Sequence, residues 1–513
     1  MKIARVDNAI RNITFGILYK AVSILLPFFI RTAMIYIMGS EYVGLGSLFT
    51  SILSVLSLAE LGVGNALVFS MYEPIANDDN DTVCALLNLY KKIYRYIGLV
   101  ILSVGLALMP FLKYLINSGY PANMNIYVLY LIYLTNTVIS YLMFGYKQSL
   151  LVAFQRSDII SKRTMAVQIL QNMIQFSVLF LTRNYYLYTI FLPVFTVITN
   201  LFNLIIVNRM YPQYTPHGEV SRELKTSIQK KVLALIGTKA NATVLHAADN
   251  IVISAFLGLT VVGMYGNYFY IMNSIVGVMT VIYSSLTAGL GNSLATESID
   301  KNYEDFKILN FLNAWMVAFC SACLICLYQP FMKLWVGAEL MFSMRIVVLL
   351  VIYFFVYQIR RIGLTYKDAA GIWWEDRFRP YVVMTVNLVF NILLVQIIGI
   401  EGVILSTVIS MLISIPWENS TIFKYIFHKP SKEYYATCVQ YTAVTAAMAI
   451  VTYAVCVWMP EGWLGVFLRA GICVVIPNLI FGFVFRKTME FRKSKELLEK
   501  KIFSKFHRSK KYE

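Results

Sequence analysis

The sequence has few charged residues, and acids are rarer in it than bases. Only 14% of its 513 residues are charged, whereas a soluble domain averages about a quarter. Long apolar stretches recur from one end of the chain to the other, and the mean hydropathy is +0.66. These shortages exclude a soluble globular protein. The apolar runs are also too long and too continuous for barrel strands, so they predict an all-α membrane protein.

About fourteen membrane-spanning helices are predicted from apolar windows of about 20 residues. The first run follows the basic segment Met1–Asn12 and has no small-residue cleavage site, so it is interpreted as a retained span. The predicted spans are residues 13–37, 45–71, 93–116, 125–153, 163–183, 187–208, 232–257, 261–290, 308–328, 344–366, 379–398, 402–426, 435–458 and 465–485.

Lysine and arginine are nearly missing from every second loop. Only Arg183 and Lys333 fall clearly in these loops, whereas the alternate loops are basic, which places the basic loops and both termini in the cytoplasm. The net charge of +17 therefore reflects membrane topology, and no nucleic-acid partner is expected. The external loops are too short to fold independently, so an external catalytic domain is excluded and the protein is not expected to be an enzyme.

A weak internal repeat divides the predicted helices. Gly44 near the start of the second span has a counterpart in Gly263 of the eighth, and Gly62-Val-Gly64-Asn65 has one in Gly289-Leu-Gly291-Asn292. Six spans per repeat would make two parallel lobes. The predicted divisions are an N-lobe over 1–213, a C-lobe over 214–430, two additional spans over 431–485 and a basic cytoplasmic tail over 486–513. The tail either lies on the anionic leaflet or is solvated.

Three cysteines repeat at one-turn spacing within an apolar predicted helix. Cys320, Cys323 and Cys326 have no fourth ligand nearby in the sequence, so they are interpreted as small packing residues. No metal site is predicted.

Charged residues inside the spans are the main functional signal. Each costs about 2.5–3.5 kcal/mol on insertion scales, so six uncompensated cations would cost on the order of 15–20 kcal/mol. Two acids, Glu60 and Asp249, are too few to pair with all of them, which favours a water-filled cavity facing an anionic substrate. The six cations are Lys20, Arg31, Lys147, Lys239, Arg360 and Arg361.

Helical geometry constrains some of these positions. Lys20 and Arg31 share nearly one face, about 16 Å apart along the axis, although Lys20 and Lys147 are also close enough to an inner helix end to snorkel. Arg360 and Arg361 point about 100° apart, so one is expected to face a narrow cavity.

Four amides form a polar stripe on the fifth predicted span. They recur at i, i+3, i+4 and i+7, and such a stripe either joins helices or lines a cavity; four in register favour the cavity wall. The stripe comprises Gln168, Gln171, Asn172 and Gln175.

The two intramembrane acids allow two interpretations. Asp249 lies one turn from His246, and both Asp249 and Glu60 could carry H⁺ or Na⁺ or could neutralise a basic residue on a facing helix. No other cofactor is expected.

Several segments resemble the Wzx-type O-antigen and polysaccharide flippases of the multidrug/oligosaccharidyl-lipid/polysaccharide exporter superfamily. The resemblance runs from the first span to about Lys432. Its segments are Tyr42–Gly46 through Leu58–Gly62, Tyr72–Asp78, Asp249–Ser254 with Gly258, and Asp368–Pro380 continuing to Gly399–Gly402.

This resemblance implies two six-helix lobes around a central cationic cavity in the bacterial inner membrane. It implies alternating access that moves undecaprenyl-pyrophosphate-linked oligosaccharide to the outer leaflet for O-antigen or capsule biosynthesis. The six intramembrane cations are the candidates to hold the pyrophosphate. Membrane lipids, a polysaccharide polymerase and glycosyltransferases are the expected partners. The alternative is a cation-coupled multidrug antiporter of the same superfamily, which would favour an anionic cavity.

Overall fold

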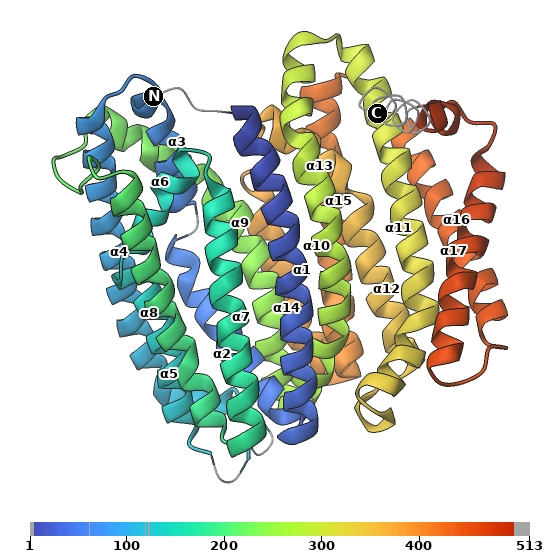
Figure 1. Cartoon of the computed structure of the whole chain (residues 1–513). Coiled ribbons are helices and arrows are strands. Elements are labelled where there is room, and N and C mark those ends of the chain that lie inside the picture. Colours follow the sequence, from blue (N-terminus) through green and yellow to red (C-terminus); the bar gives the residue numbers. More distant parts are fainter. Residues whose placement is uncertain (1–4, 61, 118–119, 122–123, 497–513) are drawn as a thin grey trace, which may run out of the picture. The chain divides into compact units, whose positions relative to one another are not determined.

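The computed structural model describes residues 5–60, 62–117, 120–121 and 124–496 (Figure 1). Within these residues all regular structure is helical, with seventeen α-helices joined by short turns. The prediction of an all-α membrane protein is confirmed. The chain forms two compact units: unit 1 comprises Met1–Gly266 with Val395–Gly399, and unit 2 comprises Asn267–Leu394 with Ile400–Glu513.

Unit 1 is built from paired helices, with α1 alongside α7, α5 alongside α8 and α2 alongside α9 (Figure 1). Its helices are α1 (Arg5–Ile37), α2 (Ser40–Leu56), α3 (Val63–Ala76), α4 (Asn80–Leu108), α5 (Ile126–Leu142), α6 (Gln148–Ala153), α7 (Ser157–Thr182), α8 (Tyr185–Met210), α9 (Arg222–Leu257) and the first turns of α10 (Leu259–Thr296).

Unit 2 is organised around α11, which contacts α12, α16 and α17. Besides the rest of α10 and most of α14, its helices are α11 (Ile299–Trp335), α12 (Met344–Ile359), α13 (Arg361–Ala370), α15 (Ile400–Ile422), α16 (Lys432–Cys456) and α17 (Trp463–Phe485), with α14 running over Arg379–Ile398. The boundary between the units falls within α10, and the predicted lobe boundary near residue 213 stays a prediction.

Each of the fourteen predicted spans overlaps a described helix. Eleven of the described helices are long and apolar enough to cross a membrane, and the bent pair Ile126–Leu142 with Gly145–Ala153 makes a twelfth. Ser40–Leu56 and Thr243–Leu257 are shorter apolar helices, and they belong to the second and seventh predicted spans. The second span is short because the helix breaks within it.

Two breaks interrupt the helices of unit 1. A 3₁₀ turn, η1 (Ser57–Glu60), separates α2 from α3, where Gly62 has a left-handed φ of +88° that favours glycine. A second turn, η3 (Gly145–Lys147), joins α5 to α6 with a bend of 48°. Glu60 and Gln148, beside the two breaks, line the same cavity. Non-helical backbone at membrane depth is typical of transporter binding sites.

The two glycines of the predicted repeat contact each other's helices. A Cβ on Gly44 would lie 2.1 Å from the Leu259 carbonyl oxygen, and a Cβ on Gly263 would lie 2.5 Å from the Ser40 carbonyl oxygen. Ser40 and Leu259 each precede the glycine of their own copy by four residues, so the contact is reciprocal. Reciprocal contacts are typical of elements related by a twofold axis, and the division into two repeats stays a prediction.

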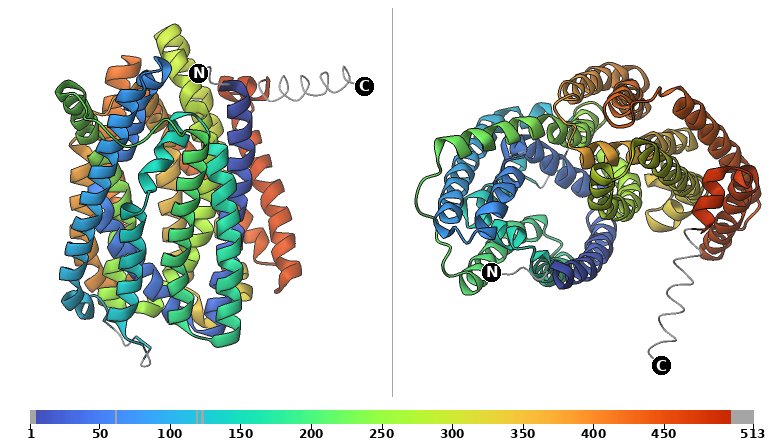
Figure 2. Two further views of the ribbon diagram at one scale, coloured as in Figure 1. Left: turned by 60° about the vertical axis from the view of Figure 1, so that its left-hand side comes forward. Right: turned by 90° about the horizontal axis from the view of Figure 1, so that it is seen from above.

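The last two helices, α16 and α17, pack on α11 (Figure 2). Phe311, Tyr441, Phe481 and Phe485 form a buried cluster, and Phe491, just beyond α17, packs against it. The first residues of the basic tail therefore fold against unit 2. Residues 497–513 lie outside the described part of the chain, so the membrane role of the tail stays a prediction.

Candidate functional site

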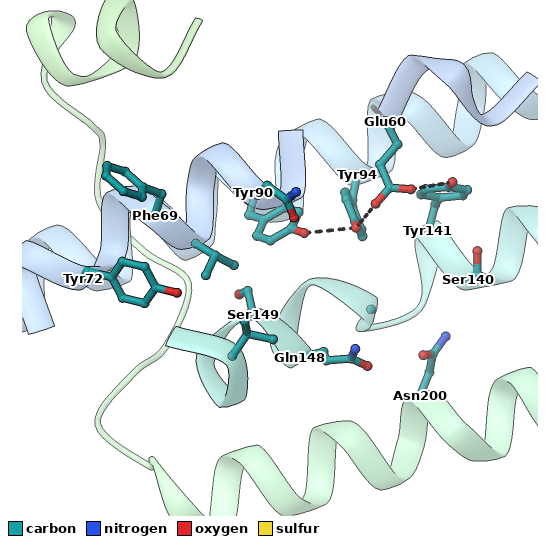
Figure 3. A pocket seen from close by; sticks show the side chains of 15 residues that line it. Glu60, Phe69, Tyr72, Tyr90, Tyr94, Ser140, Tyr141, Gln148, Ser149 and Asn200 are labelled. Atoms are coloured by element: carbon teal, nitrogen blue, oxygen red, sulfur yellow. Dashed lines mark hydrogen bonds between the residues drawn. The ribbon is translucent and has the colours of Figure 1, made fainter. Parts of the chain in front are cut away.

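A polar cavity of about 570 Å³ lies inside unit 1 (Figure 3). Its walls come from α3, α4, α5, α6 and α8, together with the two breaks described above. Glu60 and three tyrosines form one part of the wall, and Gln148, Ser149 and Asn200 form another. The cavity therefore carries a carboxylate among neutral polar groups.

Glu60 is held by a cage of tyrosine hydroxyls. Tyr94 donates a hydrogen bond of 2.5 Å to Oε1, and Tyr141 donates one of 2.8 Å to Oε2. Tyr90 donates in turn to the Tyr94 hydroxyl at 3.1 Å, and Gly64 leaves room for Tyr90, because a Cβ there would lie 2.6 Å from its hydroxyl. No described lysine or arginine forms an ion pair with Glu60. A carboxylate with neutral donors and an adjoining cavity can accept H⁺ or a small cation.

Two buried cations lie next to Gln148. Arg163 donates to Gln148 Oε1 at 3.2 Å, and Lys147 donates to Asn208 Oδ1 at 2.7 Å. Within the described residues, Arg163 Nε and Nη1 and the nearby Asn200 Nδ2 have no hydrogen-bond partner. Both cations have neutral partners and form no ion pair with a described acid, and neither of them lines the cavity itself.

Two polar contacts reach the start of α10 in unit 1, one from α1 and one from α9. Arg31 Nη2 donates to the Gly263 carbonyl at 3.3 Å, and it occupies the space that a Cβ on Gly266 would need. Asp249 is buried and accepts a 2.9 Å hydrogen bond from Tyr265. Arg31 therefore reaches across to α10, beside one of the two repeat glycines.

Unit 2 contains a buried network of charges. Glu418 Oε1 accepts from Arg360 at 2.9 Å, from Arg379 at 2.5 Å and from Ser414 at 2.7 Å. Arg379 also pairs with Asp376 at 2.8 Å, and Lys367 donates a short hydrogen bond to the same carboxylate. The network holds three cations and two carboxylates. It compensates most of its own charge and joins α12, α13, α14 and α15.

The other predicted cations stand apart from this network. Arg361 lies over the Tyr283 ring, 5.9 Å from its centroid, so it diverges from Arg360 as helical geometry requires. Lys20 is half-buried on α1, and its ammonium makes no hydrogen bond or ion pair with a described residue. Lys239 lies on α9, but its side chain is outside the described part of the structure. The pyrophosphate-binding role of all six cations stays a prediction.

The amide stripe on α7 bonds mainly to itself and to its neighbour. Gln171 donates to Gln175 at 3.4 Å, Asn172 donates to the Gln168 carbonyl at 2.6 Å, and Gln175 donates to the Tyr188 carbonyl of α8 at 3.1 Å. Gln168 Oε1 is buried and has no described partner. The stripe does not line the unit 1 cavity, and it joins α7 to α8 through Gln175.

Sequence reasoning missed several charged residues that the structure makes important. Glu418 falls inside the predicted span 402–426 and could have been counted as a third intramembrane acid. Arg163 and Arg379 are the first residues of the predicted spans 163–183 and 379–398, yet both are buried. The tyrosines that cage Glu60 come from α4 and α5, and no local pattern connects them to it.

No protein-family model matches the sequence, and no curated protein matches it. Solved structures do match in fold. A structure of the lipid II flippase MurJ in an inward closed conformation has a TM-score of 0.67 at 14% identity, covering 92% of this chain and 99% of that chain. An inward-facing MATE family multidrug resistance transporter of the MOP superfamily has a TM-score of 0.58 at 12% identity, covering 77% of this chain and 94% of that chain.

The Vibrio cholerae MATE transporter VcmN in its bent form has a TM-score of 0.54 at 14% identity, covering 82% of this chain and 97% of that chain. The chain therefore has the helical membrane-transporter fold that MurJ and the MATE transporters share.

Proposed function

We propose that this protein flips undecaprenyl-pyrophosphate-linked oligosaccharide repeat units from the inner to the outer leaflet by alternating access. The observation that carries the proposal is the extent of the fold likeness. A lipid II flippase covers 92% of this chain at a TM-score of 0.67, whereas the two MATE transporters cover 77% and 82% at 0.58 and 0.54. The product would serve O-antigen or capsule biosynthesis in a bacterial inner membrane, with both termini cytoplasmic.

The charges of the spans support an anionic substrate. Lys147 and Arg163 have amide or hydroxyl partners, and Arg361 lies over an aromatic ring. Insertion of each such cation costs about 2.5–3.5 kcal/mol, and a pyrophosphate would offset that cost when bound. Arg offers a planar fork to phosphate and Lys a point charge.

A second candidate, a cation-coupled multidrug antiporter, is favoured by one observation. Glu60 is a carboxylate with neutral donors on a cavity wall, which suits a site for H⁺, Na⁺ or a cationic compound. The same group fits the flippase proposal as a coupling site, with Asp249 as the other candidate. Binding of H⁺ or Na⁺ at that site would then drive the return of the empty transporter.

Purified protein in proteoliposomes separates the two candidates. We expect a fluorescent trisaccharide on a polyprenyl pyrophosphate to become accessible to a membrane-impermeant quencher from the opposite side, with no uptake of the cationic dye ethidium. Ethidium transport driven by an H⁺ or Na⁺ gradient, without movement of the lipid, would identify an antiporter instead.

A double variant tests the cationic role. Lys20→Ala with Arg361→Ala should slow flipping about tenfold or more, since a hydrogen bond to a charged group is worth about 1.5–3 kcal/mol. Lys113→Ala with Arg345→Ala removes two exposed cations near the opposite ends of their spans and should leave the rate unchanged. Equal flipping rates in the two double variants would show that Lys20 and Arg361 do not bind the substrate.

A further inference from the structure

Three helices of unit 2 bring three buried thiols together. Cys326 of α11, Cys456 at the end of α16 and Cys473 of α17 have Sγ atoms that all lie within 4.8 Å of one another. Their exposed fractions are 2%, 2% and 0%. The sequence shows no further thiol near Cys320, Cys323 and Cys326, because Cys456 and Cys473 come from distant helices.

A fourth thiol lies beside the group. Cys323 lies one helical turn before Cys326, packs against the same cluster and is within hydrogen-bonding reach of Cys473. The surrounding side chains are apolar, with Ile325, Leu327 and Ile472 in contact. All seven cysteines of the chain are free thiols, so no disulfide holds these sulfurs.

The spacing of the sulfurs suits a metal ion. With metal–sulfur bonds of about 2.3 Å, tetrahedral ligands stand roughly 3.8 Å apart, so three sulfurs already within 4.8 Å need only small side-chain adjustments. Thiolate ligands in an apolar environment select soft or borderline ions such as Cu⁺ and Zn²⁺ over Mg²⁺ or Ca²⁺. The donor set therefore defines the class of ion.

A buried arginine supplies charge of the sign that such a site needs. Arg469, one turn before Cys473, donates to the carbonyls of Cys456, Met459 and Pro460 at 3.1, 2.8 and 2.9 Å. Its charge also acts on the Cys456 thiol. Zn²⁺ with four thiolates carries a net charge of −2, and Cu⁺ with two carries −1, so one buried guanidinium would offset part or all of the site's negative charge in a low-dielectric environment.

We infer that Cys326, Cys456 and Cys473, with Cys323 as a fourth ligand, bind one thiophilic metal ion, Cu⁺ or Zn²⁺. The ion would cross-link α16 and α17 to α11, the helix around which unit 2 is organised. Binding requires deprotonated thiols, so each metal ion taken up releases protons from the cluster.

The test uses the full-length protein, purified in detergent under anaerobic conditions with a phosphine reductant. The variant Cys84→Ser/Cys320→Ser/Cys438→Ser retains only the four clustered thiols. We expect it to bind one equivalent of Zn²⁺ or Cu⁺, as measured by elemental analysis and by competition with a chromophoric chelator for each ion. The two competitions decide which ion the site prefers.

Adding Cys326→Ser or Cys473→Ser to that variant should weaken binding about tenfold or more, because each removes a direct ligand. Cobalt substitution gives a second readout in the unmodified protein, since tetrahedral thiolate ligation produces charge-transfer absorption in the near ultraviolet. This measurement remains decisive if a serine variant fails to fold.

Three results would overturn the inference. They are less than a tenth of an equivalent of metal on the four-thiol variant, unchanged affinity after removal of Cys326 or Cys473, and a disulfide among the four cysteines in non-reducing mass spectrometry of the protein isolated without reductant. None of them bears on the flippase proposal, because the cluster shares no residue with the cation sites tested there.

Discussion

Glu60 in unit 1 and Glu418 in unit 2 are both carboxylates within predicted spans, but their surroundings differ. Glu60 accepts hydrogen bonds from two tyrosines and borders a cavity. Glu418 is 2% exposed and accepts from two arginines and a serine. Under the proposed function, the neutral donors leave Glu60 available to H⁺ or Na⁺, whereas the two arginines pair with Glu418 in a buried network. The groups that surround an intramembrane carboxylate therefore decide whether it is available for ion coupling.

The largest expected effect comes from Glu418→Gln. Removing this charge leaves Arg360 and Arg379 buried without their common partner, and breaking a buried ion pair costs about 3–5 kcal/mol. We expect a much lower unfolding temperature of the purified protein and poor expression. Glu433→Gln is the matched control, because Glu433 pairs with Lys307 in an exposed position and should change stability by less than about 1 kcal/mol. Equal stability of the two variants would mean that the network is not structural.

Glu60→Gln should have the opposite profile, with little effect on folding and a large effect on coupling. The amide can still bond to Tyr94 and Tyr141, so the free energy of unfolding should change by less than about 1 kcal/mol. It cannot hold H⁺ or Na⁺ as a carboxylate does, so transport should no longer respond to imposed gradients of either ion. Glu73→Gln, on an exposed position of α3, is the control. An unchanged response would favour Asp249 as the coupling residue.

Tyr94→Phe and Tyr141→Phe should each have a moderate effect. Each variant deletes one donor to Glu60, and a typical hydrogen bond contributes about 0.5–1.5 kcal/mol. Thermal unfolding of both single variants and the double variant measures the loss, and the exposed Tyr96→Phe serves as the control. Full stability in the double variant would show that the cage does not hold the carboxylate.

The smallest effect is expected for Gly64→Ala. The new Cβ would meet the Tyr90 hydroxyl at 2.6 Å and displace it from Tyr94, while the helix gains about 0.5–1 kcal/mol from losing a glycine. Net stability should therefore change little, but the response to an ion gradient should weaken. Gly16→Ala, with nothing within 4 Å of its Cβ, should keep the full response. If transport by Gly64→Ala also responds fully to the ion gradient, Tyr90 does not contribute to the coupling site.

The sequence predicted one of the two carboxylate sites and only part of the other. Glu60 was recognised because a charge in an apolar run is a local signal, and Glu418 carried the same signal but was overlooked. Arg360 was predicted to bind substrate, yet it forms an ion pair with Glu418 across two helices. That pairing depends on which faces of α12 and α15 meet, and hydropathy does not report it.

The same limit applies to the cysteines and the repeat glycines. Cys323 and Cys326 could be recognised as neighbours on one helix, but Cys456 and Cys473 reach them only through the packing of α16 and α17 on α11. Gly44 and Gly263 were paired as repeat positions, and the structure adds that their helices touch there.

Sequence alone determined the membrane class, the helical architecture and the positions of the spans, because burial in hydrocarbon selects long apolar segments one helix at a time. Only the tertiary structure decided which charges are compensated, which carboxylate borders a cavity and which thiols converge. These properties arise between side chains on different helices, where a few ångströms separate a paired charge from an available one.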